Sequence, residues 1–263
     1  MQYILVTGAY GGMGKAAVQA LKKAGYFVFA LDKKVEEAET NVFPIQADIT
    51  DLESLENAFS RVQEVTSQLF AIIHFAGIYT LDSLVEIESE GLERAFQINV
   101  LGACKVNKCF LPLLKEGSRI IITTSELAPL DPLPFTGLYA VTKSALDKYA
   151  YSLRMELQLL GISVVVLRPG AVKTDMLSVS TTALDTFCQK TQLYRCNAKR
   201  FKSIVERVEA RNVPPEKIAQ KTVKILGKKN PKYIYKINRN PLLLLLNVLP
   251  KRMQTWIIKQ VLK

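Results

Sequence analysis

The sequence predicts an α/β fold: a doubly wound parallel sheet (Rossmann fold) in a single domain, followed by a C-terminal amphipathic extension. Short apolar, β-branched runs alternate along the chain with segments in which apolar residues recur at helical spacing. A glycine-rich turn ends the first run and opens the first helix. The candidate functional positions fall where predicted strands end, which is where ligands bind in a sheet of this kind.

The first predicted strand, residues 2–7, runs into the glycine-rich turn 8–14, and a helix follows over residues 15–24. Glycines let the backbone of such a turn approach a pyrophosphate, whose charge is then stabilised by the helix N-terminus. A second strand, residues 26–31, ends at Asp32. A carboxylate about 20 positions beyond the glycines is placed to hold a ribose 2′-hydroxyl and repels a 2′-phosphate. Asp32 therefore favours NAD over NADP.

The rest of the chain continues the alternation of strands and helices, which predicts a parallel sheet covered on both faces. The segment 173–213 breaks this pattern, with a loop-like stretch at 178–182 and short amphipathic helices, and is predicted to be a substrate lid. We therefore expect one domain over residues 1–240. The further predicted strands are 42–47 (before Asp48), 69–75, 119–124 (before Ser125), 163–167 (before Arg168-Pro169-Gly170) and 233–237, and the helices are 52–65, 91–114 (containing Asn99), 139–160 and 216–226.

Composition excludes some classes of site. The 263 residues include four cysteines without paired metal-ligand spacing, and with His74 as the single histidine they make no zinc set. His74 is expected to be a core or strand-end residue. Unpaired thiols and the absence of a signal peptide before the first strand predict a reducing, cytoplasmic location.

A tyrosine and a lysine four residues apart, Tyr139 and Lys143, lie on one face of the predicted helix 139–160. A free phenol has a pKa of about 10 and is a poor acid or base at neutral pH. A fixed ammonium one turn away favours the phenolate, so we expect the pKa of Tyr139 to be lowered. The pair would then exchange a proton near working pH.

Over residues 2–240 the chain resembles the short-chain dehydrogenase/reductase family, most closely its steroid and retinol dehydrogenases. TGAYGGMG at 7–14 matches the family's cofactor turn Thr-Gly-x-x-x-Gly-x-Gly, and HFAG at 74–77 matches its Asn-Asn-Ala-Gly motif. The chain departs from the family pattern in its His74-Phe75 pair, and in Ala128 beside an unusual Glu126.

The resemblance implies roles for individual residues. The catalytic tetrad is Asn99, Ser125, Tyr139 and Lys143. Tyr139 exchanges the proton, Ser125 positions the substrate oxygen, Lys143 holds the nicotinamide ribose and Asn99 anchors a water on a proton path. The implied cofactor contacts are Gly8, Gly12, Met13, Gly14, Asp32, Asp48, Ile49, Ala76, Gly77, Tyr139, Lys143, Pro169, Gly170, Val172 and Thr174, and the implied substrate contacts are Ser125, Leu127, Phe135, Tyr139 and Met176.

The implied function is an NAD-dependent oxidoreductase for a secondary alcohol or ketone of an apolar molecule, with a hydroxysteroid as the first choice. Asp32 favours oxidation, because cellular NAD pools are largely oxidised. The alternatives are a reductase of lipid or acyl ketones and a membrane-associated nucleotide sensor without turnover. The intact tetrad argues against the sensor. The resemblance also implies a homo-dimer or homo-tetramer.

Charge and apolar residues concentrate in the C-terminal part. The net charge of +11 divides into +16 over residues 189–263 and −5 over residues 1–188. Residues 241–263 join an eight-residue apolar run, too short to span a bilayer, to a helical pattern with one apolar face carrying Trp256 and one basic face. This pattern is typical of an interfacial helix and predicts peripheral membrane contact, with burial against the protein or another subunit as the alternative. The lysines lack interleaved aromatic residues, so no nucleic-acid partner is expected.

Overall fold

The computed structural model describes residues 1–209 and 211–263, with the side chains of all of these except 175–181 and 208–209. Within the described residues, seven parallel strands form one sheet in the order β3-β2-β1-β4-β5-β6-β7. This is the predicted doubly wound sheet, with its chain reversal between β1 and β4. The strands are β1 (Tyr3–Thr7), β2 (Phe27–Asp32), β3 (Val42–Gln46), β4 (Leu69–His74), β5 (Leu114–Thr123), β6 (Ser163–Pro169) and β7 (Ile234–Ile237).

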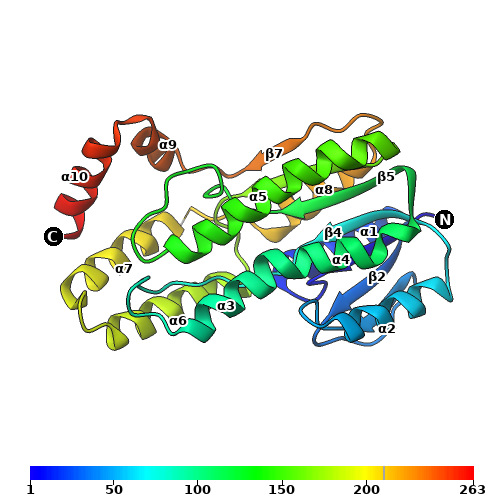
Figure 1. Ribbon diagram of the computed structural model, residues 1–263, viewed down its shortest axis with the longest axis horizontal. Helices are drawn as coiled ribbons and strands as arrows, with labels where there is room; N and C mark the ends of the chain where they lie inside the picture. The colour runs from blue at the N-terminus through cyan, green and yellow to red at the C-terminus, as the bar shows by residue number, and fades with distance from the viewer. Residues whose placement is uncertain (210) are drawn as a thin grey trace.

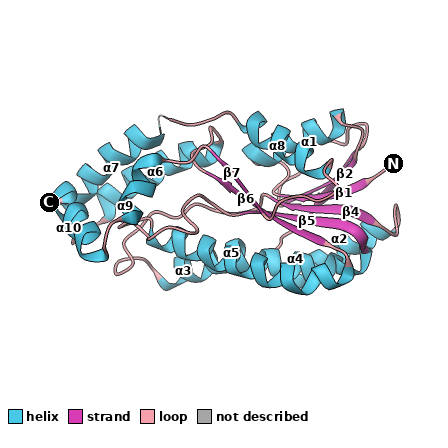
Figure 2. Ribbon diagram, turned by 90° about the horizontal axis from the view of Figure 1, so that it is seen from above, coloured by secondary structure: helices cyan, strands magenta, loops and turns pink. Residues whose placement is uncertain are grey.

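Helices cover both faces of the sheet, so the strands need apolar residues on both sides (Figure 2). Within β1, for example, Leu5 packs into one buried cluster, while Ile4 and Val6 pack into the cluster on the other face. One face is covered by α1 (Gly12–Lys23) and α8 (Pro215–Leu226), and the other by α2 (Leu52–Gln63), α4 (Gly102–Phe110) and α5 (Gly137–Leu157).

The predicted helix 91–114 is interrupted. It consists of α3 (Ser89–Phe96), a π-helical turn η1 (Gln97–Leu101), α4 and a short 3-10 turn, and β5 begins at Leu114, five residues before the predicted start. A π-turn inserts one residue into the helical repeat, which sequence periodicity does not register. The loop predicted at 178–182 is also wrong, since these residues lie in α6 (Asp175–Lys190).

Four helices that follow β6 lie beyond the carboxyl ends of the strands, whereas α8 and β7 belong to the layers of the sheet itself. There α6 and α7 (Arg195–Glu209) form a pair against which α9 (Pro241–Val248) and α10 (Lys251–Leu262) lie, at the end of the molecule opposite the N-terminus (Figure 1). A third buried cluster holds α6, α7 and α10 together and includes Phe135, Phe187, Phe201 and Leu262. Among the described helices, none has the length and apolar character that crossing a bilayer requires.

Candidate active site

A cleft of about 810 Å³ opens at the carboxyl ends of β1, β2, β3 and β4. The glycine-rich turn forms one wall. Gly8 has a φ of +67°, which a residue with a side chain rarely adopts, and a Cβ on Gly14 would overlap the Gly8 carbonyl oxygen. A Cβ on Gly12 would likewise overlap the Thr174 side chain. The turn is therefore compact enough for backbone N–H groups to reach a phosphate at the N-terminus of α1, and the residues present fit a dinucleotide.

The acidic residues predicted for the adenosine end lie in this cleft. The Asp32 carboxylate accepts hydrogen bonds from the Tyr10 and Lys33 backbone N–H groups, at 2.9 and 2.7 Å. The Lys33 ammonium reaches across to Asp48 at 2.7 Å. Burial alone would raise the pKa of Asp48, but hydrogen bonds from Lys33 and Thr50 outweigh it and hold that pKa at about 2. Both carboxylates are thus fixed in place before any ligand binds.

The π-turn η1 places Asn99 in a buried position behind the Gly77–Ile78 backbone, where it lines neither the cleft nor the second cavity. Its side-chain oxygen accepts the Ile78 N–H at 2.8 Å, and its amide donates to the Ile78 carbonyl and to the Thr142 hydroxyl. A Cβ on Gly77 would lie 3.1 Å from that oxygen and 3.3 Å from the Lys143 Nζ. Both groups therefore face the same glycine, and any side chain there would come between them. The predicted water beside Asn99 stays a prediction.

Tyr139 and Lys143 occupy successive turns of α5 and are both buried. The Lys143 Nζ lies 5.7 Å from the Tyr139 ring centroid and 3.4 Å from the Thr123 carbonyl oxygen. Burial raises the pKa of Tyr139 to about 12, although hydrogen bonding with Ser125 opposes this, and burial lowers the pKa of Lys143 to about 8. The expected lowering of the pKa of Tyr139 is therefore wrong for this state of the protein, because desolvation disfavours the phenolate.

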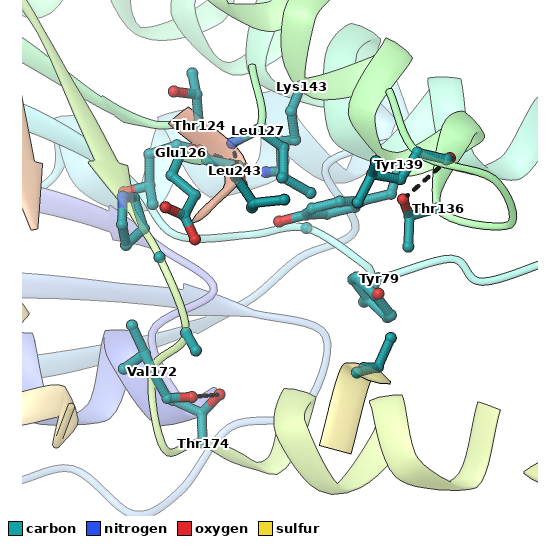
Figure 3. Close-up of a pocket in the computed structure, with 18 of the residues that line it drawn as sticks. Tyr79, Thr124, Glu126, Leu127, Thr136, Tyr139, Lys143, Val172, Thr174 and Leu243 are labelled. Atoms are coloured by element: carbon teal, nitrogen blue, oxygen red, sulfur yellow. Dashed lines mark hydrogen bonds between the residues drawn. The ribbon is translucent and has the colours of Figure 1, made fainter. Parts of the chain in front are cut away.

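A second cavity, of about 240 Å³, is lined by Ser125, Tyr139 and Lys143 of the predicted tetrad (Figure 3). It meets the first cleft at Met13, Gly77 and Thr174, which line both. Ser125, Tyr139 and Lys143 form its polar wall, whereas most of the other side chains in its lining are apolar. Those apolar side chains come mainly from the loop after β5, the segment after β6, α7 and α9, and include Leu127, Leu133, Val172, Phe201, Ile204 and Leu243.

The structure brings most of the predicted residues together. The first cleft is lined by Gly8, Gly12, Met13, Gly14, Asp32, Asp48, Ile49, Ala76, Gly77 and Thr174, and the second cavity by Ser125, Leu127, Tyr139, Lys143, Pro169, Gly170 and Val172.

Among the described side chains, one predicted substrate contact does not line the cavity. The Phe135 ring packs against Phe187, Tyr194 and Phe201, while its neighbours Leu133 and Thr136 line the cavity. The side chain of Met176 lies outside the described residues.

Sequence reasoning assigned no site role to several lining residues. The Tyr79 ring lies 4.8 Å from that of Tyr139 in a tilted arrangement, and Leu243 comes from α9, more than 100 residues further along the chain. Glu126 also lines the cavity, directly after Ser125, and its departure from the family pattern was the one feature of the sequence that pointed to it.

His74 is buried and hydrogen-bonded to Asn107 at 2.8 Å, and burial lowers its pKa to about 4, as expected for a core residue.

A parallel sheet with a cleft of dinucleotide size at its strand ends, and a buried Ser-Tyr-Lys group beside that cleft, defines a Rossmann-fold protein with a candidate active site. The sequence model described as short chain dehydrogenase matches residues 2–185, so the chain belongs to the short chain dehydrogenase family. A solved short chain dehydrogenase from Burkholderia cenocepacia, in complex with NADP, is 20% identical with a TM-score of 0.74, and each chain is covered fully by the other.

Relatives with assigned activities differ in substrate. Estradiol 17-beta-dehydrogenase 2 of Mus musculus is 34% identical over 185 residues, which are 66% of this chain and 49% of that protein. The chain thus spans about half the length of this relative. 3-Ketodihydrosphingosine reductase of Bacteroides thetaiotaomicron is 25% identical over 257 residues, covering 97% of this chain and 93% of that protein.

Proposed function

We propose that this protein transfers a hydride reversibly between NAD(H) and a secondary alcohol or ketone on an apolar molecule. The observation that carries the proposal is the placement of Ser125, Tyr139 and Lys143 along one wall of an apolar cavity that meets the nucleotide cleft at Gly77. When bound, the cofactor supplies or accepts the hydride.

The chain's own residues manage the substrate oxygen and its proton. In the reducing direction the Tyr139 hydroxyl, protonated because burial holds its pKa at about 12, donates its proton to the oxygen of the ketone. Ser125 hydrogen-bonds the same oxygen and fixes its position. The Lys143 ammonium stabilises the phenolate that remains, and Asn99 holds the Gly77–Ile78 backbone beside it. The oxidising direction reverses these steps.

A hydroxysteroid is our first choice of substrate, and a lipid or acyl ketone is the second. The similarity to an estradiol dehydrogenase supports the steroid. The similarity to 3-ketodihydrosphingosine reductase over nearly the whole chain, including the α9 residue Leu243, supports the lipid ketone. Turnover of NAD with matched panels of hydroxysteroids, retinoids and long-chain acyl ketones tests both. Cofactor binding without turnover of any member would instead favour the nucleotide sensor.

The preference for NAD rests on Asp32, whose fixed carboxylate faces the ribose end of the cleft. The adjacent Lys33 ammonium is paired with Asp48, so its positive charge is not available to a 2′-phosphate. Replacing Asp32 by Ser removes the repulsion and should shift the ratio of kcat/KM values toward NADP. A wild-type protein that uses both cofactors equally well would refute the assignment.

We also propose that α9 and α10 bind an anionic lipid surface. Leu245, Val248 and Trp256 are 64, 82 and 63% exposed on these helices, next to the exposed basic residues Lys251 and Arg252. The exposed apolar side chains can insert among the lipid chains, and the flanking positive charges are attracted to the anionic headgroups. Each basic residue near the surface contributes about 1 kcal/mol to binding. An apolar substrate would then enter the cavity close to the lipid.

Co-sedimentation with vesicles of phosphatidylserine and phosphatidylcholine tests this docking. Serine at positions 245, 248 and 256 together should abolish salt-sensitive binding while leaving Tm unchanged, because these side chains are exposed. The control is Leu159→Ser, which removes an equally exposed leucine after α5. Wild-type protein that does not bind anionic vesicles overturns the proposal.

The expected homo-dimer or homo-tetramer stays a prediction that light scattering tests.

A further inference from the structure

Glu126 is a carboxyl group in an otherwise largely apolar part of the substrate cavity. It follows Ser125 directly, and its backbone N–H donates to the Pro169 carbonyl at 2.8 Å, which ties the loop after β5 to the end of β6. Its side chain is half-buried and lines the cavity beside Leu127 and Leu243. In Figure 3 the phenol oxygen of Tyr139 points toward the side of the cavity where this carboxyl lies.

The two carboxyl oxygens of Glu126 differ in their surroundings. Oε2 accepts the Asn240 backbone N–H at 2.6 Å, just before α9 begins. Oε1 lies over Gly170, where a Cβ would stand 2.8 Å from it, and no donor within the described part of the chain bonds to it. Glu126 is only half-buried, so water can reach this oxygen until a ligand fills the cavity. A carboxylate oxygen left unpaired among apolar groups is costly, so an apolar ligand that displaces the water has to supply a partner for it.

The charges around Glu126 indicate what kind of partner is missing. Burial raises the pKa of this carboxyl, while the Asn240 N–H and the charge of Arg239 oppose the rise. Lys143, on the tetrad wall, is committed to the Thr123 carbonyl and the Tyr139 ring. A hydroxyl would give Oε1 a hydrogen bond but would leave its charge uncompensated, whereas an ammonium supplies both the bond and the charge.

We propose that Glu126 binds an ammonium group carried by the substrate close to its reacting carbon, so that the preferred substrates are apolar amino ketones and amino alcohols. This inference rests on the proposed hydride transfer and narrows its substrate class. The position next to Ser125, which holds the reacting oxygen, places the ammonium within a few bonds of that carbon. Glu126 is thus a specificity-determining residue.

The competing role for Glu126 is structural: it fastens the start of α9 through Asn240. Asp131 offers a matched control, because it also fastens the C-terminal segment but does not line the cavity. Its carboxylate pairs with Lys251, and its backbone N–H donates to the Asn247 side chain at 2.6 Å. If the preference depends only on how the C-terminal segment is fastened, it should fall in Asp131→Asn, which loses the pair with Lys251, as well as in Glu126→Gln. If it depends on recognition of the ammonium, it should fall in Glu126→Gln alone.

The test compares kcat/KM for a long-chain 2-amino ketone and for the same ketone without the amine. Wild-type protein should prefer the amino ketone by about tenfold or more, as expected for a charged hydrogen bond. Glu126→Gln should reduce that ratio to near one, and Asp131→Asn should leave it unchanged. A wild-type ratio near one, or an equal fall of the ratio in both variants, overturns the proposal.

A pH series on wild-type protein keeps the test independent of folding in the variant. The preference should disappear as pH falls through the pKa of Glu126, and again as pH rises through that of the substrate amine. A preference that does not change with pH refutes a charge-based contact.

Calorimetric binding of dodecylamine against dodecanol separates this inference from the proposed hydride transfer. If neither ketone is reduced, the hydride transfer proposed for such ketones fails. Tighter dodecylamine binding that Glu126→Gln abolishes would then still support the ammonium site, and equal binding of the two probes would refute it.

Discussion

At the scale of single residues, burial acts on Tyr139 and Lys143 in opposite directions. It raises the pKa of the phenol to about 12 and lowers the pKa of the ammonium to about 8. Both shifts disfavour the charged form, as expected for groups removed from water. Tyr139 is therefore protonated at neutral pH and can act as a proton donor. When it gives up its proton, the neighbouring Lys143 ammonium has to stabilise the phenolate.

Tyr139→Phe keeps the ring and its contact with Tyr79 but removes the transferable proton. We expect turnover to fall by about 10²–10⁴, the usual contribution of a positioned general acid. Cofactor affinity should change little, because the nucleotide cleft is lined mainly by other residues. Steady-state kinetics and a fluorescence titration with NADH measure the two effects. Near-normal turnover would remove Tyr139 from the mechanism.

Lys143→Met should abolish turnover and yet stabilise the protein. Because burial lowers the pKa of Lys143 from 10.5 to about 8, the buried ammonium destabilises the fold at neutral pH. Removing the charge should add on the order of 3 kcal/mol at pH 7. Between about pH 8 and 10.5 the unfolded chain binds more protons, so wild-type stability should rise relative to the variant. Thermal unfolding at both ends of this window checks the sign, and a variant less stable than wild type at pH 7 would contradict it.

Motif spacing was sufficient to predict residues at or just beyond the ends of strands, such as Asp32 and Ser125, because the end of a strand fixes where the adjoining residues lie. It was insufficient for Leu243 and Tyr79. Their place in the cavity depends on how α9 and the loop after β4 pack, which involves contacts between distant parts of the chain. Phe135 was misplaced for a related reason, since its apolar ring has a better partner in the aromatic cluster formed with α6 and α7.

At the scale of elements, α5 is fixed over the sheet by an ion pair between Asp147 and Arg168 of β6. The guanidinium donates to both carboxylate oxygens, at 2.9 and 2.6 Å, and the Thr124 hydroxyl adds a third bond. Both partners are largely buried. Since Thr124 precedes Ser125 and Asp147 lies one turn beyond Lys143, the ion pair positions the tetrad through the elements that carry it.

Asp147→Leu should destabilise the protein by about 3–5 kcal/mol, because it leaves the Arg168 guanidinium buried without its partner. The double variant with Arg168→Leu should recover much of that loss, since both charges are then absent. Denaturant unfolding of the two single variants, the double variant and wild type gives the coupling energy. A double variant less stable than either single one would show that the pair does not act as a unit.

Periodicity predicted the strands and most helices to within a few residues, because parallel strands buried on two faces read as continuous apolar runs. Periodicity did not predict the π-turn η1, although this turn brings Asn99 close to Gly77. One extra residue per turn alters the phase of a helix without altering its composition. In α6 the Ser/Thr-rich stretch reads as a loop by local preference, and the sequence does not reveal the helix pairing with α7 that overrides it.

At the scale of the whole molecule, the C-terminal segment is both part of the fold and exposed. Its inner side contributes Leu262 to the aromatic cluster and Leu243 to the cavity wall. The Asn197 amide also donates to the Leu262 carbonyl at 2.6 Å. Its outer side presents Leu245, Val248 and Trp256. The two alternatives predicted from the sequence, membrane contact and burial against the protein, therefore concern different sides of the same helices.

Truncation after Asn240 should consequently cost stability as well as lipid binding. It removes the buried Leu262 from the cluster around Phe135 and Phe201, a loss of roughly 2–5 kcal/mol by analogy with a large-to-small core substitution. It also opens the cavity where Leu243 stood, so KM for an apolar substrate should rise. Thermal unfolding and kinetics of the truncated chain measure both. The triple serine variant at 245, 248 and 256 is the control, since it alters the outer side alone. A truncated chain with wild-type Tm and KM would show that these helices only carry the lipid-binding surface.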